Sequence, residues 1–280
     1  AINRIFLLFS RANTSSNRIV EILEQDDTLV LLDKTLVESD DHIEFRNVNF
    51  SYNQTKNDID DISFKIKRYS TFGIIGSTGS GKSTLAQLLL RFYEIDSGKI
   101  LIDGQDIRSY EVNALRQKFG VVFQQDVLFS LSVKENIKFG RDMDSESIME
   151  AADYAQARSF VEQLNDKYDE RVLRQGANFS GGQKQRMLIA RALANNPEII
   201  ILDDASSALD YKTDSELRAA IKNHINATTI LITQRISTVL NADCILVIED
   251  GKMVGMGTHA QLAESCGLYK ELIQLQLGGV

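Results

Sequence analysis

The run Gly76-Ser-Thr-Gly-Ser-Gly-Lys-Ser-Thr84 constrains the fold of this chain more than any other feature. It matches the phosphate-binding pattern G-x-x-x-x-G-K-[ST], and it stands between an apolar strand-like run, Thr71–Ile75, and a run with helical spacing, Ser83–Arg91. Glycines let successive backbone N–H groups point at phosphate oxygens, and a helix N-terminus adds a positive field. The motif therefore predicts a strand–loop–helix unit that holds the phosphates of a nucleotide, and a plain Gly/Ser-rich turn is the alternative.

Each residue type in this loop has an expected duty. Lys82 should reach the β and γ phosphates, and Ser83 should offer its hydroxyl to Mg²⁺, which prefers substrate phosphates and a few protein oxygens. The remaining residues expected to surround the nucleotide phosphates are Ser77, Thr78, Gly79, Ser80, Gly81 and Thr84. ATP and Mg²⁺ are thus the predicted ligands.

A second acidic element fits the same chemistry. The apolar run Ile199–Leu202 ends in Asp203 and Asp204, and a carboxylate at the end of such a strand can hold the Mg²⁺ of a P-loop nucleotide, directly or through water. Asp203 is the predicted metal ligand. An acidic turn without a metal is the alternative.

Composition limits the partners. The chain has 280 residues, of which 43% are hydrophobic, so it can bury one large core or a main domain with a smaller subdomain. Its net charge of −8 argues against a broad electrostatic hold on nucleic acid or anionic lipid. The 2 cysteines show neither metal spacing nor a disulfide framework, which is typical of a reducing compartment. The apolar run Ile5–Phe9 is far shorter than the ~18 residues that a membrane span requires.

The order of patterns predicts an α/β fold. Residues 1–40 are interpreted as an extension or linker from a membrane domain, with apolar residues on one helical face, and residues 41–280 as the main domain. Short alternating runs from Ile43 predict an antiparallel β subdomain, and helical spacing predicts an inserted helical subdomain over about 126–196. The alternation of apolar strands and helices that follows predicts a mostly parallel sheet in a P-loop NTPase core.

A further phosphate-binding device precedes the acidic strand. Ser180 is placed to cap the helix that begins at Gly181, and the Ser-Gly-Gly opening exposes backbone amides at the positive end of that helix. The candidate residues are Ser180, Gly181, Gly182 and Gln183.

Together these residues resemble a known family. Gly76–Thr84, Phe179–Gln183 and Leu202–Asp204 closely resemble the Walker A, signature and Walker B motifs of ATP-binding cassette (ABC) nucleotide-binding domains. Leu90–Tyr93 and Ile102–Gln105 look like the exporter branch, and the resemblance covers about residues 43–277. It implies two such domains closing head to tail, each nucleotide lying between one Walker A and the other chain's signature. It also implies transmembrane domains that make contact through intracellular loops, and a place at the cytoplasmic face of the cell membrane.

The resemblance assigns further roles. Tyr52 matches the aromatic residue that stacks on adenine, with a core tyrosine as the alternative, and Gln124 matches the glutamine that contacts Mg²⁺ or water. Asp210 belongs to a segment like the D-loop, which communicates between two sites. Arg174 stands in a loop that touches the intracellular loops in exporters, where an acid is expected, although a solvated loop without a special role fits equally well.

Two departures concern the catalytic step. Asp204 stands where the family has a glutamate that polarises the attacking water, and Gln234 stands where it has a histidine. A displacement of about 1 Å can cost on the order of a hundredfold in rate, and glutamine cannot relay a proton as imidazole does. With a nearly intact signature, the chain resembles the degenerate half of a bacterial heterodimeric exporter. A second, non-identical nucleotide-binding domain is then the expected partner, and the chain's own Walker site is expected to be an impaired ATPase.

Two other interpretations stay open. The chain could be a regulatory ATP-binding module without hydrolysis of its own, or an ABC ATPase of DNA repair or translation. The acidic charge and the missing coiled-coil heptads disfavour a nucleic-acid partner. The transported substrate is not encoded in this part of the sequence.

Overall fold

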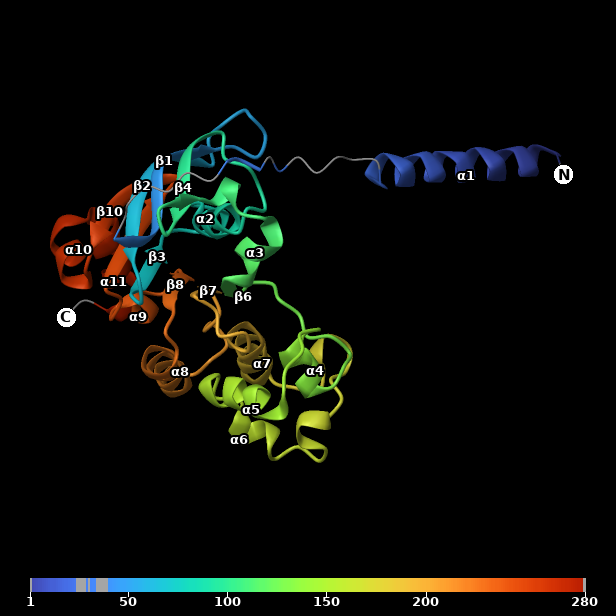
Figure 1. Cartoon of the computed structure of the whole chain (residues 1–280). Coiled ribbons are helices and arrows are strands. Elements are labelled where there is room, and N and C mark those ends of the chain that lie inside the picture. Colours follow the sequence, from blue (N-terminus) through green and yellow to red (C-terminus); the bar gives the residue numbers. More distant parts are fainter. Residues whose placement is uncertain (1, 24–28, 30, 34–39, 279–280) are drawn as a thin grey trace. The chain divides into compact units, whose positions relative to one another are not determined.

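The structure is a computed structural model that describes residues 2–23, 29, 31–33 and 40–278. The chain forms two units, 1–31 and 32–280. In the first unit a single helix, α1 (Ile2–Leu23), runs through the polar stretch Ser10–Asn17 without a break (Figure 1). The Thr14 hydroxyl donates to the Ser10 carbonyl at 2.9 Å within that stretch. Among the described residues, no helix is both long enough and apolar enough to cross a membrane.

The second unit begins with an antiparallel sheet of order β2-β1-β4-β5. Its strands are β1 (Asp41–Phe50), β2 (Ile59–Lys67), β4 (Ser97–Ile102) and β5 (Gln105–Asp106). The two short runs expected near Ile43 and Val48 are one strand, whose register shifts where Asn47 takes a positive φ of 46°. The Asn47 N–H is satisfied by the Ser63 hydroxyl at 2.8 Å, so the strand continues past the irregularity.

The larger sheet has the order β10-β9-β3-β8-β7-β6. Its strands are β3 (Thr71–Ile75), β6 (Phe119–Val122), β7 (Ile199–Asp203), β8 (Thr228–Thr233), β9 (Cys244–Glu249) and β10 (Lys252–Gly257). All pairings are parallel except that of β10 with β9. The carboxyl ends of β3, β6, β7 and β8 therefore meet at one edge of the sheet, which is where ligands bind in open α/β sheets.

Helices connect and cover these strands (Figure 1). Their bounds are α2 (Lys82–Leu89), α3 (Val112–Gln117), α4 (Val133–Lys138), α5 (Ser145–Tyr154), α6 (Arg158–Val161), α7 (Gly181–Leu193), α8 (Tyr211–His224), α9 (Ile236–Val239), α10 (His259–Ser265) and α11 (Gly267–Leu277). Helices α4 to α7 pack on one another within the span 126–196 that the sequence assigned to a helical subdomain. The P-loop NTPase fold with mixed sheets and a helical subdomain is thus confirmed.

Both faces of the parallel part of the larger sheet are buried, which explains the uninterrupted apolar strands there. On β7, Ile200 and Leu202 belong to the hydrophobic cluster shared with the helical subdomain, whereas Ile199 and Ile201 belong to the cluster shared with the antiparallel sheet. Stacked rings join the two sheets: Phe64 lies 4.5 Å from Phe45 and 5.2 Å from Phe72, measured between ring centroids.

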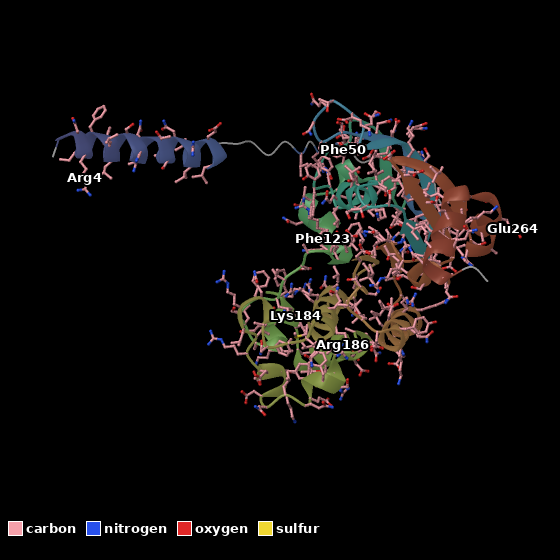
Figure 2. The ribbon with its side chains drawn as sticks, turned by 180° about the vertical axis from the view of Figure 1, so that it is seen from behind. Arg4, Phe50, Phe123, Lys184, Arg186 and Glu264 are labelled. Atoms are coloured by element: carbon pink, nitrogen blue, oxygen red, sulfur yellow. The ribbon has the colours of Figure 1, made fainter. Side chains whose placement is uncertain are left out.

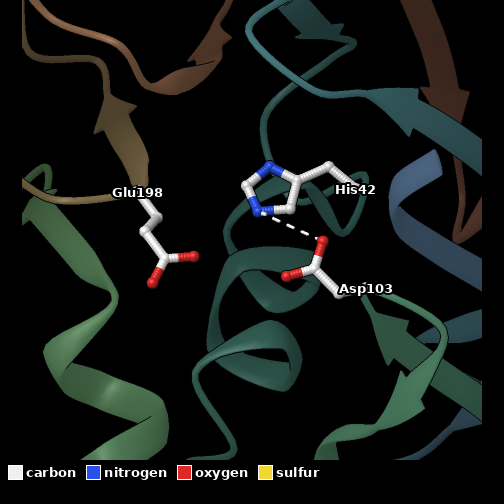
Figure 3. Close-up of side chains that lie close together, drawn as sticks. All are labelled: His42, Asp103 and Glu198. Atoms are coloured by element: carbon white, nitrogen blue, oxygen red, sulfur yellow. Dashed lines mark ion pairs between the residues drawn. The ribbon is translucent and has the colours of Figure 1, made fainter. Parts of the chain in front are cut away.

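A polar group also links the sheets at His42, whose place at the edge of the main domain in the sequence predicts a structural role. Its Nδ1 pairs with the Thr228 hydroxyl at 2.7 Å, and its Nε2 lies 3.9 Å from an oxygen of Asp103 (Figure 3). Glu198 completes a group whose ligand atoms lie within 4.8 Å of one another. Asp103 already pairs with Arg68, however, and Glu198 with Lys118. Because both carboxylates already have cationic partners, we interpret the group as a structural link between the two sheets.

The C-terminal part differs from expectation in two ways. Residues 252–257 form an edge strand, β10, that the sequence pattern did not indicate, because its side chains are mostly exposed. The sequence pattern predicts a single helix over His259–Leu277, whereas the structure has two, α10 and α11, because Cys266 between them has extended backbone angles (φ −107°, ψ 113°).

Candidate nucleotide-binding site

The phosphate-binding loop leaves the central strand β3 and enters α2. Gly79 and Gly81 have φ values of 78° and 102°, in the left-handed region that side chains disfavour. A Cβ at Gly76 would lie 2.0 Å from the carbonyl oxygen of Ile248 on β9, so only glycine fits there. The loop is therefore shaped by backbone requirements at three of its glycines.

Lys82 lies at the start of α2 and is almost fully buried. Its ammonium donates to the carbonyl oxygens of Gly76 at 3.0 Å and Ser77 at 2.6 Å, so it is directed into the loop. Burial lowers the pKa of Lys82, whereas the carboxylates of Asp204 and Asp203 favour its charged form. A cation held this way is placed to meet phosphate oxygens.

The two acids at the end of β7 differ in environment. Asp203 is 4% exposed and accepts a hydrogen bond from the Ser83 hydroxyl. Burial raises the pKa of Asp203, and the Ser83 hydrogen bond opposes this rise. Asp204 follows with a positive φ of 49°, and its N–H donates to the Ile232 carbonyl on β8 at 2.8 Å. One carboxylate thus lies against the Ser83 hydroxyl, while the other is held at the edge of the sheet.

Tyr52 reaches the site from the loop after β1. Its hydroxyl donates to Gln87 at 2.7 Å and lies 3.2 Å from the Thr84 hydroxyl, both on α2. Its ring packs edge-on against Tyr93 at 5.1 Å. Tyr52 as a whole remains 43% exposed, which leaves a surface on which a planar base can stack.

These elements surround one cavity of about 270 Å³. Its lining consists of Tyr52, Asp58, Thr78, Gly79, Gly81, Lys82, Ser83, Thr84, Gln124, Asp203, Asp204 and Gln234. The structure thus brings together most of the residues that the sequence assigned to ATP and Mg²⁺. Ser77 and Ser80 lie outside this lining, and the Ser80 side chain is buried.

Sequence reasoning missed Asp58. Its carboxylate accepts a hydrogen bond from the Tyr52 N–H at 2.9 Å, which fixes the loop that carries the aromatic ring. The only available signal was its place six residues after Tyr52 in a polar turn. That signal is too common to single out one acid.

Gln234 enters the cavity from the loop after β8. Its side-chain oxygen accepts from the Thr78 hydroxyl of the phosphate-binding loop at 3.2 Å. Gln124 enters from the loop after β6 and is exposed. Both side chains therefore line the same cavity as Lys82 and Asp203.

The signature residues lie elsewhere. Ser180 caps α7: its hydroxyl accepts from the Gln183 N–H at 3.3 Å, and the Gln183 side chain accepts from the Ser180 N–H at 2.9 Å. Ser180, Gly181, Gly182 and Gln183 are all outside the cavity lining. Further along the helix lies Arg186, which Figure 2 labels. Its guanidinium carbon lies over the Phe160 ring, 4.6 Å from the ring centroid.

Asp210 also has a local structural role. As the N-cap of α8 it accepts from the Thr213 N–H at 2.9 Å and from the Thr213 hydroxyl at 2.7 Å. The segment before it is tied to the Gln234 loop, because the Arg235 guanidinium donates to the Ser207 carbonyl at 3.2 Å.

Comparison with known proteins agrees with this geometry. Residues 59–207 match the model of the family described as ABC transporter. The uncharacterized ABC transporter ATP-binding protein YknU of Bacillus subtilis is 41% identical over 276 residues, which cover 96% of this chain and 47% of YknU. The alpha-hemolysin translocation ATP-binding protein HlyB of Escherichia coli is 42% identical over 272 residues, which cover 96% of this chain and 38% of HlyB.

A solved structure, that of a bacterial Atm1-family ABC exporter with ATP bound, is similar with a TM-score of 0.88 and 34% identity. The match covers 96% of this chain and 48% of that one. The chain thus spans about half the length, or less, of these three relatives.

Proposed function

Since the chain belongs to the ABC transporter family and is an ATP-binding domain of the exporter type, we propose that it binds Mg-ATP in the described cavity and hydrolyses it slowly. The observation that carries this proposal is the convergence of Lys82, Asp203 and Gln234 on one cavity. Backbone amides and an ammonium suit the phosphates.

The donor set fits a magnesium ion. The Ser83 hydroxyl and the Asp203 carboxylate lie within hydrogen-bonding distance of each other and supply two oxygen ligands, the kind that Mg²⁺ prefers. Mg²⁺ bound there would neutralise charge on the phosphates. Gln124 is the third proposed ligand, direct or through water.

Slow turnover follows from the two residues that face the attacking water. Asp204 is one methylene shorter than glutamate, and its backbone is held by Ile232, so the loop is not free to carry the carboxylate forward. Gln234 can hydrogen-bond the terminal phosphate but cannot carry a proton. Both departures weaken general-base activation of water while they leave nucleotide binding intact.

The partner is proposed to be a second, non-identical nucleotide-binding domain. Ser180, Gly181, Gly182 and Gln183 lie outside the chain's own cavity, so their exposed helix N-terminus is available for the phosphates of a nucleotide on another chain. Asp210, at the end of the D-loop segment, is proposed to lie at the same interface. HlyB is named as a translocation ATP-binding protein. By analogy, we propose that this domain lies at the cytoplasmic face of the cell membrane and is coupled to transmembrane domains. Residues 1–40 would then be the linker to those domains.

ATP binding and turnover test the proposal. The 280-residue chain should bind Mg-ATP, Lys82→Ala should abolish binding, and turnover by the chain alone should stay far below the order of 10 per second of an efficient phosphoryl-transfer enzyme. The double variant Asp204→Glu with Gln234→His should raise turnover at least tenfold at unchanged ATP affinity. The matched control is Asp250→Glu, an equivalent lengthening of an exposed acid in the turn between β9 and β10.

The two measurements separate the alternatives. Fast hydrolysis by the wild-type chain alone would contradict the impaired site. Binding without any gain in the double variant would favour the regulatory module over the motor domain.

A further inference from the structure

The loop that carries Gln234 is held from outside by the last turn of α11. The Gln276 side-chain N–H donates to the Gln234 carbonyl oxygen at 2.7 Å, and the Gln276 side-chain oxygen accepts from the Ile236 N–H at 2.8 Å. One primary amide thus pairs with two backbone groups two residues apart, as a neighbouring strand would. These two bonds fix the backbone of the tripeptide Gln234–Ile236.

The bond between the Ile236 N–H and the Gln276 side-chain oxygen satisfies a donor at the start of α9. Ile236 is the first residue of α9, and its cap residue Arg235 makes no side-chain capping bond. The first N–H groups of a helix have no intrahelical acceptor. Gln276 therefore supplies, from a segment 40 positions away in sequence, an acceptor for the first of these N–H groups.

The helix that presents Gln276 is firmly anchored. Tyr269 on α11 is fully buried, and its hydroxyl pairs with Nδ1 of His259 at 2.9 Å. Leu272 and Ile273 pack on the main hydrophobic cluster. The Gln276 side-chain amide is thus held by a helix that packs on the core.

On its other side the same loop faces the phosphate-binding loop. The Gln234 side chain contacts Thr78 of the phosphate-binding loop at 3.2 Å, so the direction of this side chain depends on where its backbone is held. We propose that Gln276 is a positioning residue that sets the reach of Gln234 toward the terminal phosphate; this rests on the proposed function. Through this positioning role, the preference of the site for ATP over ADP depends on the C-terminal helix α11.

The test measures the affinity of the 280-residue chain for Mg-ATP and for Mg-ADP by titration calorimetry. Gln276→Ala should weaken Mg-ATP binding about three- to tenfold, the effect of one misplaced hydrogen bond, and leave Mg-ADP binding within twofold. Gln276→Glu keeps the acceptor for the Ile236 N–H but sets a carboxylate against the Gln234 carbonyl. It should shift the ATP/ADP ratio in the same direction while α9 remains capped.

A matched control lies two positions away. Gln274 is an exposed glutamine on α11 whose side chain makes no hydrogen bond to the described part of the chain. Gln274→Ala should change neither affinity. Gln234→Ala should lose ATP preference on its own, and adding Gln276→Ala to it should produce no further change, because the second residue acts only through the first.

Two results would overturn the inference. Equal weakening of ATP and ADP by Gln276→Ala, or full additivity in the double variant, would reduce Gln276 to a general support of the fold. If the wild-type chain fails to bind Mg-ATP, or Lys82→Ala binds it as well as wild type does, the proposed function falls and this inference falls with it. Lys82-dependent ATP binding with an unchanged ATP/ADP ratio in Gln276→Ala refutes the positioning role alone.

Discussion

Replacing Arg191 by methionine tests how the signature helix is joined to the loop that carries Gln124. Arg191 lies in the last turn of α7 and is 6% exposed. Its guanidinium donates to the Asn136 carbonyl at 2.9 Å, to the Asn136 side-chain oxygen at 2.9 Å and to the Val127 carbonyl at 3.0 Å. It also lies over the Phe139 ring, with its central carbon 4.6 Å from the centroid.

The magnitude follows from these contacts. Methionine keeps much of the apolar stem but removes three charge-assisted hydrogen bonds, each with a net value of roughly 1.5–3 kcal/mol, and leaves the backbone carbonyl of the buried Asn136 without this donor. Burial lowers the pKa of Arg191, and the same desolvation offsets part of that gain. We expect a net loss of about 3–5 kcal/mol in the free energy of unfolding, as for a buried charge network that loses one member.

Thermal unfolding followed by circular dichroism measures this loss. At about 2–4 °C per kcal/mol for a domain of this size, Arg191→Met should lower the Tm by roughly 10 °C. Arg158→Met is the matched control, because Arg158 pairs with Glu162 on the surface, with both side chains 47% exposed, and should shift the Tm by no more than about 2 °C. A Tm for Arg191→Met within that control range would refute the reasoning.

Three other predictions concern separate parts of the chain. Burial lowers the pKa of His42 below 6.5; the charges of Arg68 and Lys118 add to this shift, and those of Asp103 and Glu198 oppose it. As the pH falls below 6.5, the unfolded chain therefore takes up a proton at His42 that the native state resists. The Tm should fall more steeply between pH 7 and 5 in wild type than in His42→Gln, and equal slopes would contradict this. Gly76→Ala should abolish Mg-ATP binding because its Cβ would meet the Ile248 carbonyl at 2.0 Å, whereas Gly267→Ala, with no atom within 4 Å of the added carbon, should bind normally. Ser180→Ala should cost about 1 kcal/mol of stability through the lost cap of α7 yet leave the chain's own ATP affinity unchanged, and a large loss of that affinity would contradict the placement of the signature outside the cavity.

The sequence determined the local structures that depend on neighbours in the chain. The loop Gly76–Thr84, the acids that end β7 and the capping box at Ser180 were all readable, because turn glycines, apolar runs and caps act over a few residues. The parallel sheet followed from the same patterns, whereas the role of Gln234 came only from the family resemblance.

Only the tertiary structure decided which distant groups complete the site. Asp58 steadies the Tyr52 loop, and Gln276 holds the Gln234 loop from the C-terminal helix α11. Strand β10 is a similar case, since its exposed side chains give no alternation and its pairing with β9 is what makes it a strand. The physical reason is the same in all three cases. Each of these groups acquires its role from a backbone partner that the packing of the whole core brings near, whether the group is a side-chain amide, a carboxylate or an edge strand. Such pairings produce no periodic pattern in the sequence.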